Sequence, residues 1–412
     1  MTATLKPVVN DKRLLTRLSD LAKLGATKDG GVCRLALTDN DRLGRDFLVA
    51  LMQDANLHVR IDQIGNIFGI RRGQKDLPAV MTGSHPDTVR NGGKYDGAYG
   101  ILAGLEVIET LNDLNIETIR PIIVCAFTNE EGARFHPDMM GSLVYAGGLE
   151  LDTALSTCDA NGLTLGQELK RIAYDGDMPC GDIVPRAFIE VHIEQGPILE
   201  REEIQIGVVE NLQGISWQEV IFHGQANHAG TTPMQGRKDA GFCAAALAVY
   251  VRELSGDFGG NQVATIGEIE LTPNVINVVP NRARITIDIR NTDNAILCLA
   301  EQQIKKKIEE LAASENTTSE TRVLARFDPV LFDQDIASII EENAIALNLS
   351  HRRMTSGAGH DAQMMSRICP AAMIFVPSKD GISHNPREHT DADDLVAGAN
   401  VLLHSLLAIA NE

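Results

Sequence analysis

Three short runs of the chain are apolar throughout and give way directly to polar residues. They are residues 79–81 (AVM), 122–127 (IIVCAF) and 371–376 (AAMIFV). A run with no polar interruption is typical of a strand that is covered on both faces, which favours an α/β layer fold with a largely parallel sheet. In such a sheet, ligands bind beyond the carboxyl ends of the strands. The polar residues after each run are therefore the expected place for chemistry.

The middle of the chain has a different pattern. From about Gly214, half-buried strands of period two alternate with helical segments. The strand-like stretches are 217–222, 262–271 and 283–290, and the helical ones are 238–254 and 294–313. This alternation is typical of a small sandwich of strands and helices, and the α/β pattern of the first half returns after it.

The length of the chain also argues for two domains. Single hydrophobic cores stop growing at about 250 to 300 residues, and this chain has 412. We predict an α/β domain at residues 1–212 and 330–412, with a largely parallel mixed sheet flanked by helices. An α+β domain at residues 213–329 is inserted into it.

The charge of the chain excludes two classes of partner. Its formal net charge is −19, whereas nucleic acids and anionic membranes both need a basic surface. The chain also lacks a run of about 18 apolar residues, so we expect no membrane-spanning segment. Neither nucleic acid nor a membrane is an expected partner.

The cysteines and the first residues bear on the cellular compartment. The seven cysteines are scattered singly, with no CxxC pair and an odd total. This pattern favours reduced thiols over a disulfide framework or a thiolate zinc site. Met1 to Asn10 lacks the apolar stretch of a signal peptide. We therefore expect a cytoplasmic protein.

Histidines and carboxylates gather after the predicted strands and in a glycine-rich stretch at 92–97. They are His85 and Asp87, Asp96, Glu130 and Glu131, His192, and His384. Three imidazoles and two carboxylates at strand ends are what two divalent ions need if one carboxylate bridges them. The combination therefore points to a dinuclear metal site.

Each of these residues alone has a plainer explanation. A lone His-x-Asp is more often a hydrogen-bonded surface pair, and Glu130-Glu131 can begin a helix, where the macrodipole stabilises carboxylates. His192 can be a satisfied core histidine, and His384 a loop residue. The glycine-rich stretch can be only a turn, and it lacks the GxxxxGK[ST] pattern of a phosphate loop.

Seven segments in order carry a resemblance to one enzyme family. They are GSHxDT at 83–88, GGxYDG at 92–97, NEEG at 129–132, HIEQGP at 192–197, NHAGTTPM at 227–234, SGAGHDA at 356–362 and GISH at 381–384. Together they resemble the hydantoinase/carbamoylase amidases, a family within the dinuclear zinc peptidase/aminoacylase superfamily. Its members include N-carbamoyl-L-amino acid hydrolases, allantoate amidohydrolases and β-ureidopropionases. The matches cover nearly the whole chain.

The resemblance implies two divalent metal ions per subunit. His85, Asp96 and His192 would hold the first ion. Asp96 would also bridge to the second ion, held by Glu131 and His384. These ligand types suit zinc, and manganese, cobalt or nickel can occupy the same kind of site.

Two further carboxylates receive roles from the resemblance. Glu130 would be the general base, because a carboxylate that is not a ligand is free to accept the proton of the attacking water. Asp87 fits the carboxylate that orients His85 and raises its basicity.

The resemblance also identifies residues 213–329 as a lid and dimerisation domain of a homodimer. The implied substrate-binding residues are Gln195, His228, Asn277, Arg290, Gly359 and His360. His228 would also act in catalysis by stabilising the oxyanion, and Arg290 would anchor a carboxylate through a bidentate pair. Two of these residues have plainer alternatives: Arg290 can be a surface charge at a strand end, and Asn277 a turn residue.

The implied reaction is hydrolysis of the carbamoyl or ureido C–N bond of a small carboxylate substrate. An N-carbamoyl-L-amino acid would give an L-amino acid, carbon dioxide and ammonia. Allantoate amidohydrolase and β-ureidopropionase stay open as alternatives. A dinuclear peptidase or deacylase is less favoured, because peptidase branches usually have Asp or Glu where His192 stands. A non-catalytic scaffold would be expected to lack a ligand or the base, and this chain has them all.

Overall fold

The structure, a computed structural model, describes residues 7–412 of the chain. It forms two compact units: unit 1 (Met1–Glu210 and Phe332–Glu412) and unit 2 (Asn211–Leu331). The prediction that Met1 to Asn10 holds no signal peptide falls largely outside the described residues. The role of residues 213–329 as a lid and dimerisation domain stays a prediction.

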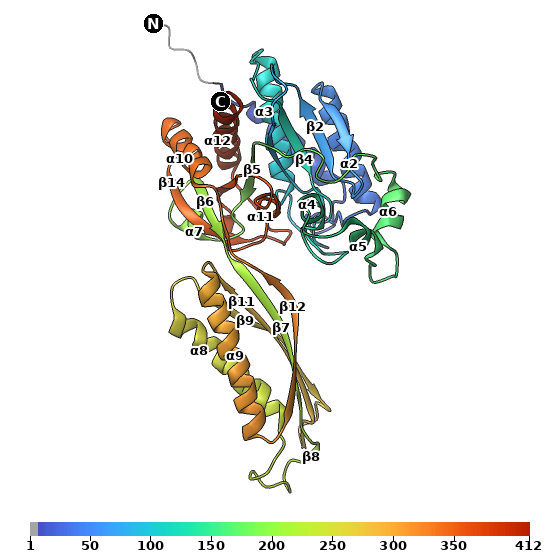
Figure 1. Ribbon diagram of the computed structural model, residues 1–412, viewed down its shortest axis with the longest axis vertical. Helices are drawn as coiled ribbons and strands as arrows, with labels where there is room; N and C mark the ends of the chain where they lie inside the picture. The colour runs from blue at the N-terminus through green and yellow to red at the C-terminus, as the bar shows by residue number, and fades with distance from the viewer. Residues whose placement is uncertain (1–6) are drawn as a thin grey trace. The chain divides into compact units, whose positions relative to one another are not determined.

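Unit 1 is built on a mixed sheet with a parallel centre (Figure 1). In sheet order the strands are β1 (His58–Ile61), β2 (Ile67–Arg71), β4 (Ile122–Ala126), β3 (Val80–Ser84), β5 (Ala187–Ile193), β15 (Ala371–Val376) and β6 (Ile206–Leu212), with β14 (His351–Ser356) also paired to β6. At the unit boundary, the end of β6 that lies in unit 2 pairs with β13 (Val330–Leu331).

The central strands of this sheet run parallel. They are β4, β3, β5 and β15, whereas β1, β2 and β6 pair antiparallel to their neighbours. All residues of the four central strands are buried, as expected for parallel strands that are covered on both faces. The predicted α/β fold class, with a largely parallel mixed sheet flanked by helices, is confirmed.

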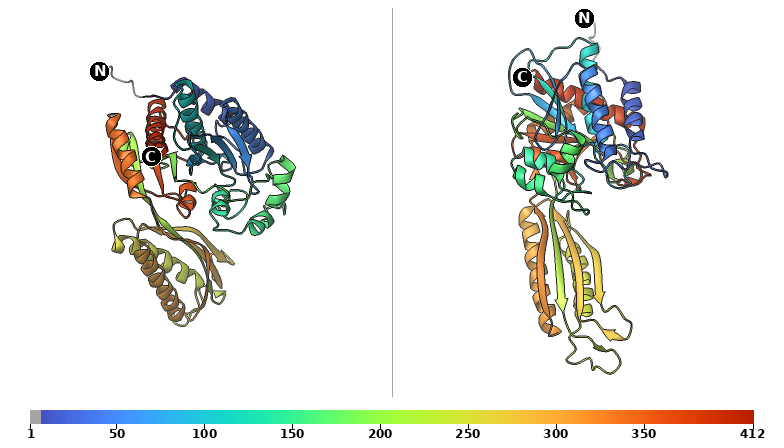
Figure 2. Two further views of the ribbon diagram at one scale, coloured as in Figure 1. Left: turned by 45° about the horizontal axis from the view of Figure 1, so that its top comes forward. Right: turned by 90° about the vertical axis from the view of Figure 1, so that its right-hand side faces the viewer.

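Helices flank the sheet, as the two views of Figure 2 show. They are α1 (Asp11–Lys23), α2 (Asp39–Asp54), α3 (Ala98–Asp113), α4 (Met140–Tyr145), α5 (Leu151–Ser156), α6 (Leu165–Ile172), α7 (Ile198–Arg201), α10 (Gln334–Ala346), α11 (Asp361–Met365) and α12 (Ala392–Ala410), with a 3-10 turn η1 (Lys379–Gly381).

Helix α3 lies unusually close to the sheet because two glycines face it. A Cβ atom at Gly100 would lie 2.8 Å from the carbonyl oxygen of Val191, and one at Gly104 would lie 3.0 Å from a methyl group of Thr82. No side chain fits there without a shift. This packing holds the first turn of α3, and Asp96 just before it, at the carboxyl ends of β3 and β5.

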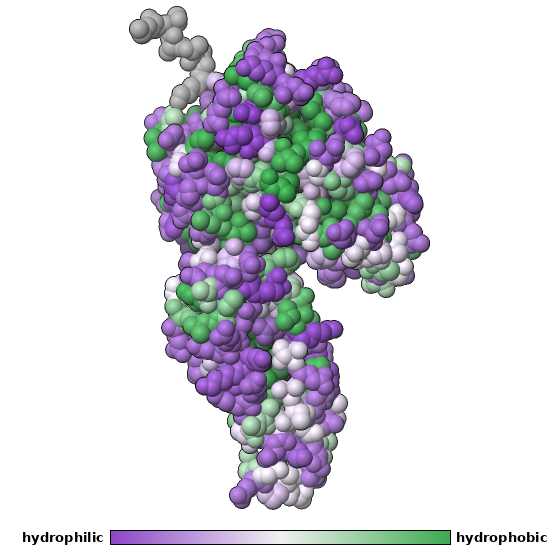
Figure 3. Space-filling model, viewed as in Figure 1, coloured by the Kyte–Doolittle hydropathy of each residue, from purple (hydrophilic) through white to green (hydrophobic). Residues whose placement is uncertain are grey.

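Helix α12 is long and apolar enough to cross a membrane, the one such helix among residues 7–412. Of its most apolar window, 56% is buried, and it packs on α3, α10 and β15. A helix that is apolar on most sides is expected in the core of a large domain. Hydrophilic residues cover most of the surface visible in Figure 3, with apolar residues scattered between them.

Unit 2 is a four-stranded antiparallel sheet with two helices on one face. The strand order is β12 (Thr318–Phe327), β7 (Gly214–His223), β11 (Arg282–Asn291) and β9 (Val263–Thr272), and the helices are α8 (Ala240–Phe258) and α9 (Asn294–Ser314). Along β11, Ala283, Ile285, Ile287 and Ile289 alternate into the core formed with the helices, which is the period-two pattern of a half-buried strand. A separate two-stranded ladder joins β8 (Asn227–His228) to β10 (Val278–Val279).

Candidate metal centre

The loops after four strands of unit 1 meet at one edge of the sheet. His85 follows β3, Glu131 follows β4, His192 lies in β5, His384 follows β15, and Asp96 precedes α3. The ligand atoms of His85, Asp96 and His192 lie within 4.8 Å of one another, and so do those of Asp96, Glu131 and His384. The structure thus brings the predicted ligands together in two groups that share Asp96.

The two carboxylate oxygens of Asp96 are divided between these groups. Oδ1 lies 3.2 Å from Nε2 of His192 and 3.6 Å from Nε2 of His85. Oδ2 lies 3.2 Å from Nε2 of His384, whose ring is also 3.2 Å from Oε2 of Glu131. This is the arrangement of a carboxylate that bridges two cations.

The hydrogen bonds of two histidines fit cation ligands. Nδ1 of His85 lies 3.0 Å from the backbone oxygen of Asp87, and Nδ1 of His192 lies 2.9 Å from that of Ile193. Carbonyl oxygens accept only, so each Nδ1 carries a proton and donates it. In the neutral ring, each Nε2 then faces Asp96 with its lone pair, and the Nε2 of His192 also accepts from the N–H of Gly97 at 3.2 Å. Lone pairs that face a carboxylate call for a cation between them, so this donor set fits divalent metal ions.

The electrostatics of the cluster point the same way. Burial lowers the pKa of His85, but the carboxylates of Glu130 and Asp96 outweigh burial and raise that pKa well above its usual value. Burial and the neighbouring Asp96 together raise the pKa of Glu131 to about 8. Burial likewise raises the pKa of Glu130. Crowded, buried carboxylates of this kind are what bound cations would neutralise.

Glu130 lies beside the ligands and outside both ligand groups. Its Oε2 is 3.4 Å from Nε2 of His85, and it is 8% exposed. The backbone N–H groups of Glu130 and Glu131 both donate to the carboxylate of Asp87, at 3.2 Å and 3.3 Å. Asp87 therefore fixes the turn that carries both glutamates.

This contact differs from the one predicted for Asp87. The sequence predicted that the Asp87 carboxylate orients His85, whereas the backbone carbonyl of Asp87 makes that contact. The physical reason lies in the turn after β4, where Asn129 has a φ of +55°. The chain leaves its strand there, and the two following N–H groups need an acceptor, which the buried carboxylate supplies.

Two predicted substrate residues of unit 1 lie at the metal centre. Nε2 of Gln195 donates to Oδ2 of Asp96 at 2.9 Å. The ring of His360 lies 4.6 Å from that of His192, and its Nε2 has no hydrogen-bond partner among the described residues. Burial and the neighbouring His192 hold the pKa of His360 well below its usual value, so its ring is neutral. Gly359 precedes it and packs against Met139.

The other predicted substrate residues belong to unit 2. His228 is exposed, and its Nδ1 accepts hydrogen bonds from the N–H groups of Gly230 at 3.1 Å and Thr231 at 3.2 Å. Nδ1 therefore carries no proton, and the neutral ring presents Nε2–H as a donor. Asn277 is its neighbour, since the carbonyl of Asn277 accepts from the N–H of Ala229.

Arg290 lies near the end of the four-stranded sheet that is far from the β8–β10 ladder, which carries His228. Arg282 pairs with His223 at the end of β11 next to the β8–β10 ladder, whereas Arg290 pairs with Ile215 near the other end. At roughly 3.4 Å per residue, these ends are about 27 Å apart. The guanidinium of Arg290 makes an ion pair with Asp288 at 3.0 Å. One copy of unit 2 therefore cannot present His228 and Arg290 to the same small molecule.

The sequence missed two residues that support this centre, Ser383 and Glu388. Glu388 is 4% exposed and accepts hydrogen bonds from the N–H groups of Tyr95 and Asp96. Burial and the charge of Asp96 raise the pKa of Glu388 to about 7. The one signal in the sequence was its position four residues after His384, and that position alone does not show which segment it meets.

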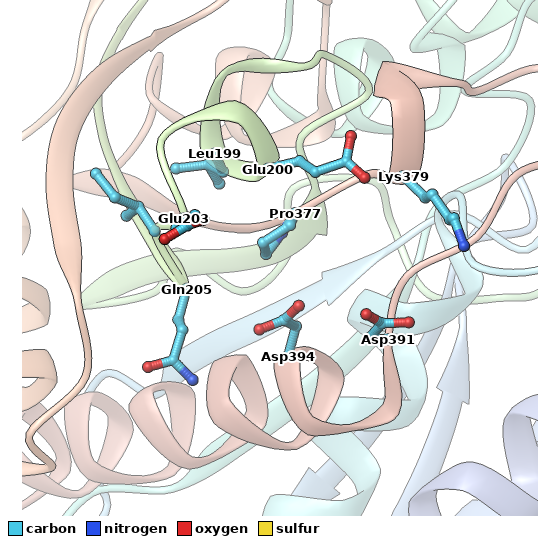
Figure 4. A pocket seen from close by; sticks show the side chains of 9 residues that line it. Leu199, Glu200, Glu203, Gln205, Pro377, Lys379, Asp391 and Asp394 are labelled. Carbon is cyan, nitrogen blue, oxygen red and sulfur yellow. The ribbon is translucent and has the colours of Figure 1, made fainter.

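A separate cavity of about 250 Å³ lies between α7 and the start of α12 (Figure 4). Its charged lining consists of Glu200, Glu203, Lys379, Asp391 and Asp394. Burial and the neighbouring Asp391 raise the pKa of Asp394 to about 6. No predicted site residue lines this cavity, and an acidic lining by itself does not identify a ligand.

Known proteins resemble the chain over nearly its full length. The family described as Peptidase family M20/M25/M40 matches residues 81–408. An N-carbamoyl-L-amino-acid amidohydrolase of Rhizobium meliloti is 39% identical over 403 residues, which is 98% of this chain and 97% of the relative. A ureidoglycolate hydrolase of Arabidopsis thaliana is 35% identical, over 96% of this chain and 86% of the relative. The crystal structure of a hydantoinase/carbamoylase family amidase from Burkholderia multivorans superimposes with a TM-score of 0.94 at 44% identity, covering 98% and 99% of the two chains.

Proposed function

The chain belongs to the hydantoinase/carbamoylase amidases of peptidase family M20/M25/M40, and from this membership we propose that it hydrolyses the carbamoyl C–N bond of an N-carbamoyl-L-amino acid. The products are an L-amino acid, carbon dioxide and ammonia. The observation that carries the proposal is the division of the two Asp96 oxygens between two ligand groups, with Glu130 beside them. The likeness to a ureidoglycolate hydrolase supports a second candidate class, another small ureido acid. Within that class we propose allantoate and N-carbamoyl-β-alanine as alternative substrates.

We assign the cations to the predicted ligands. His85, Asp96 and His192 would hold one divalent ion, and Asp96, Glu131 and His384 the other. Zinc is the first candidate, and manganese, cobalt and nickel accept the same donors. Two such ions, when bound, lower the pKa of a water molecule and polarise the carbonyl that it attacks.

Glu130 takes the proton of the attacking water and returns it to the leaving nitrogen. The water oxygen first bonds to the carbamoyl carbon, and the bond from that carbon to the amino-acid nitrogen then breaks. The carbamic acid released decomposes to carbon dioxide and ammonia. Burial raises the pKa of Glu130, and a base exchanges protons most readily when its pKa lies near the working pH. Asp87 keeps this carboxylate in place through the backbone N–H of Glu130.

Unit 2 would supply the remaining contacts to the substrate. The Nε2–H of His228 suits the oxyanion that forms at the carbamoyl carbon. The guanidinium of Arg290 suits the carboxylate of the substrate, which would then replace Asp288 as its partner. Asn277, next to His228, can hydrogen-bond the same substrate.

The separation of His228 from Arg290 within unit 2 supports a homodimer with shared sites. His228 lies on the β8–β10 ladder, next to the Arg282 end of β11. Arg282 and Arg290 are about 27 Å apart along that strand at the usual rise per residue. A small substrate can meet both only if they come from two copies of the chain. We therefore propose that unit 2 is a lid and dimerisation domain, and that each site takes Arg290 from one subunit and His228 from the other.

Mixing two inactive variants tests the shared site. A Glu130→Gln subunit and a His228→Ala subunit should regain activity when their chains exchange, because one site of the mixed dimer then carries neither change. Equal amounts should give about a quarter of the wild-type turnover, since half of the dimers are mixed and each has one intact site. The matched control is His223→Ala, a half-buried histidine of unit 2, which should be active alone.

Failure to regain turnover, with subunit exchange proven by mass spectrometry, would mean that His228 serves its own subunit or does not act in catalysis. Recovery without exchange of chains would point to contamination by wild-type protein.

A substrate panel tests the function itself. Ammonia release should be fastest with an N-carbamoyl-L-amino acid and slower with allantoate and N-carbamoyl-β-alanine. Cleavage of a dipeptide releases no ammonia, so it is followed by the free amino acids that form. Fastest release from allantoate would favour the second candidate. Cleavage of the dipeptide alone would favour a metallopeptidase.

We also propose a cytoplasmic location. All seven cysteines are free thiols in the structure, which is typical of a reducing compartment.

A further inference from the structure

The carboxylate of Glu388 joins two segments that carry metal ligands. Its Oε1 accepts hydrogen bonds from the backbone N–H groups of Tyr95 at 2.9 Å and Asp96 at 3.2 Å. Its Oε2 accepts from the hydroxyl of Ser383 at 2.8 Å, next to His384. One buried side chain therefore spans the gap between the bridging carboxylate and the loop of the last ligand.

The glycine-rich stretch makes room for this side chain. A Cβ atom at Gly93 would lie 1.9 Å from the carboxyl carbon of Glu388, so any other residue at position 93 would displace the carboxylate. The hydroxyl of Ser383 also lies 3.0 Å from Oδ2 of Asp96. Ser383 thus sits between the two carboxylates, Glu388 and Asp96.

The loop that holds His384 depends on such contacts. His384 has a φ of +51°, a conformation that residues other than glycine adopt rarely. Its side chain is 51% exposed, so packing does little to fix it. The N–H of Glu388 donates to the carbonyl of Asn385 at 3.0 Å, which closes the loop, while its carboxylate ties the loop to Asp96.

The ligands of the other group are fixed differently. The rings of His85 and His192 are 98% or more buried and are oriented by backbone carbonyls at the ends of two central strands. Among the described residues, neither ring forms a hydrogen bond with Glu388. Loss of the Glu388 carboxylate should therefore affect the two groups unequally.

We propose that Glu388 is a positioning residue that sets the spacing between Asp96 and His384 and so determines whether the second cation, at Asp96, Glu131 and His384, is bound. The proposal rests on the proposed function, because it assumes two cations per subunit. It concerns their relative affinity and leaves the substrate open.

Calorimetric titration of metal-free protein with Co²⁺ and with Zn²⁺ tests this role. Wild type should bind two equivalents per subunit. In Glu388→Ala, one equivalent should weaken by about 10 to 100-fold, the usual effect of removing a group that orients a ligand, while the other changes by less than about threefold. His384→Ala should weaken the same equivalent, and the absorption spectrum of bound Co²⁺ identifies which one it is.

Two milder variants keep the test independent of folding. Glu388→Gln retains an oxygen acceptor for the two N–H groups and should bind the second ion more tightly than Glu388→Ala. Ser383→Ala removes only the hydrogen bond between Glu388 and the loop of His384. It should weaken binding of the second cation by less than Glu388→Ala does. Conservative rescue of this kind is not expected if Glu388 contributes only to folding stability.

A buried carboxylate elsewhere in unit 1 provides the matched control. Glu106 is fully buried in α3, where it accepts from the N–H of Asn10 and pairs with Arg13 at 2.7 Å. Glu106→Gln should lower the melting temperature and leave both equivalents at wild-type affinity.

The outcomes separate the inference from the function. Equal binding of two equivalents by wild type and by all three variants of Glu388 and Ser383 would overturn the positioning role. An equal loss at both equivalents would also overturn it. Fewer than two equivalents in wild type would instead contradict the proposed dinuclear function.

Discussion

Replacing Glu130 by Gln is expected to lower kcat by at least ~10²-fold, in line with the usual contribution of a general base. The amide has nearly the same size as the carboxylate but cannot accept the proton of the attacking water. Because Glu130 lies outside both ligand groups, the variant should keep both cations. The measurement is kcat for an N-carbamoyl-L-amino acid, together with metal content by elemental analysis.

The neighbouring glutamate provides the control. Glu131 lies 3.2 Å from Nε2 of His384 within a ligand group, so Glu131→Gln should lose metal as well as turnover. A Glu130→Gln protein with full metal and near-normal kcat would show that another group takes the proton. A Glu130→Gln protein that loses metal would show that Glu130 is itself a ligand.

Replacing Asp96 by Asn should have a larger effect than any change at the base. Both ligand groups share the Asp96 carboxylate, whose oxygens lie 3.2 to 3.6 Å from the Nε2 atoms of three histidines. The variant should bind no more than one cation tightly. Turnover should fall by more than ~10³-fold, because loss of a cation removes several kcal/mol of charge stabilisation in addition to activation of the water.

A second buried aspartate shows whether the effect is specific. Asp62 is fully buried in unit 1 and accepts from the N–H groups of Ile64 and Asn66. Asp62→Asn should lower thermal stability and leave metal content unchanged. Two tightly bound cations in Asp96→Asn would be incompatible with a bridging role for this residue.

The proximity of the candidate ligands could be predicted because strand order constrains where they lie. Residues that follow parallel strands meet at one edge of the sheet, so the histidines and carboxylates after the apolar runs had to lie close together. Asp96 follows no strand, and its place depends on the close packing of α3 through Gly100 and Gly104. Only the resemblance to a family pointed to it as the bridging residue.

Contacts between side chains and distant backbone could not be predicted. The Glu388 carboxylate meets the N–H of Asp96 across 292 residues of sequence, and no local pattern encodes that meeting. The same holds for Asp87, whose carboxylate accepts from the N–H groups of Glu130 and Glu131 while its backbone carbonyl contacts His85. Such contacts depend on which N–H groups the folded loops leave unpaired.

The register of the strands in unit 2 could not be predicted from the sequence either. Period-two alternation predicted the strands, but the pairing of β7 with β11 decides that Arg290 lies opposite Ile215 and far from the β8–β10 ladder. A strand's register is set by packing and turn geometry together. That register, rather than any motif, is what supports a site shared between two subunits.

Ammonia release before and after removal of metal tests the central claim most directly. Exhaustive chelation should abolish release of ammonia from an N-carbamoyl-L-amino acid while the circular dichroism spectrum stays largely unchanged, because the buried sheet of unit 1 does not depend on the ligands. Adding two equivalents of a divalent cation per subunit should restore release, with ammonia and amino acid formed in equal amounts. Full turnover by metal-free protein would contradict the account, and so would a reconstituted enzyme that releases no ammonia from any carbamoyl or ureido acid.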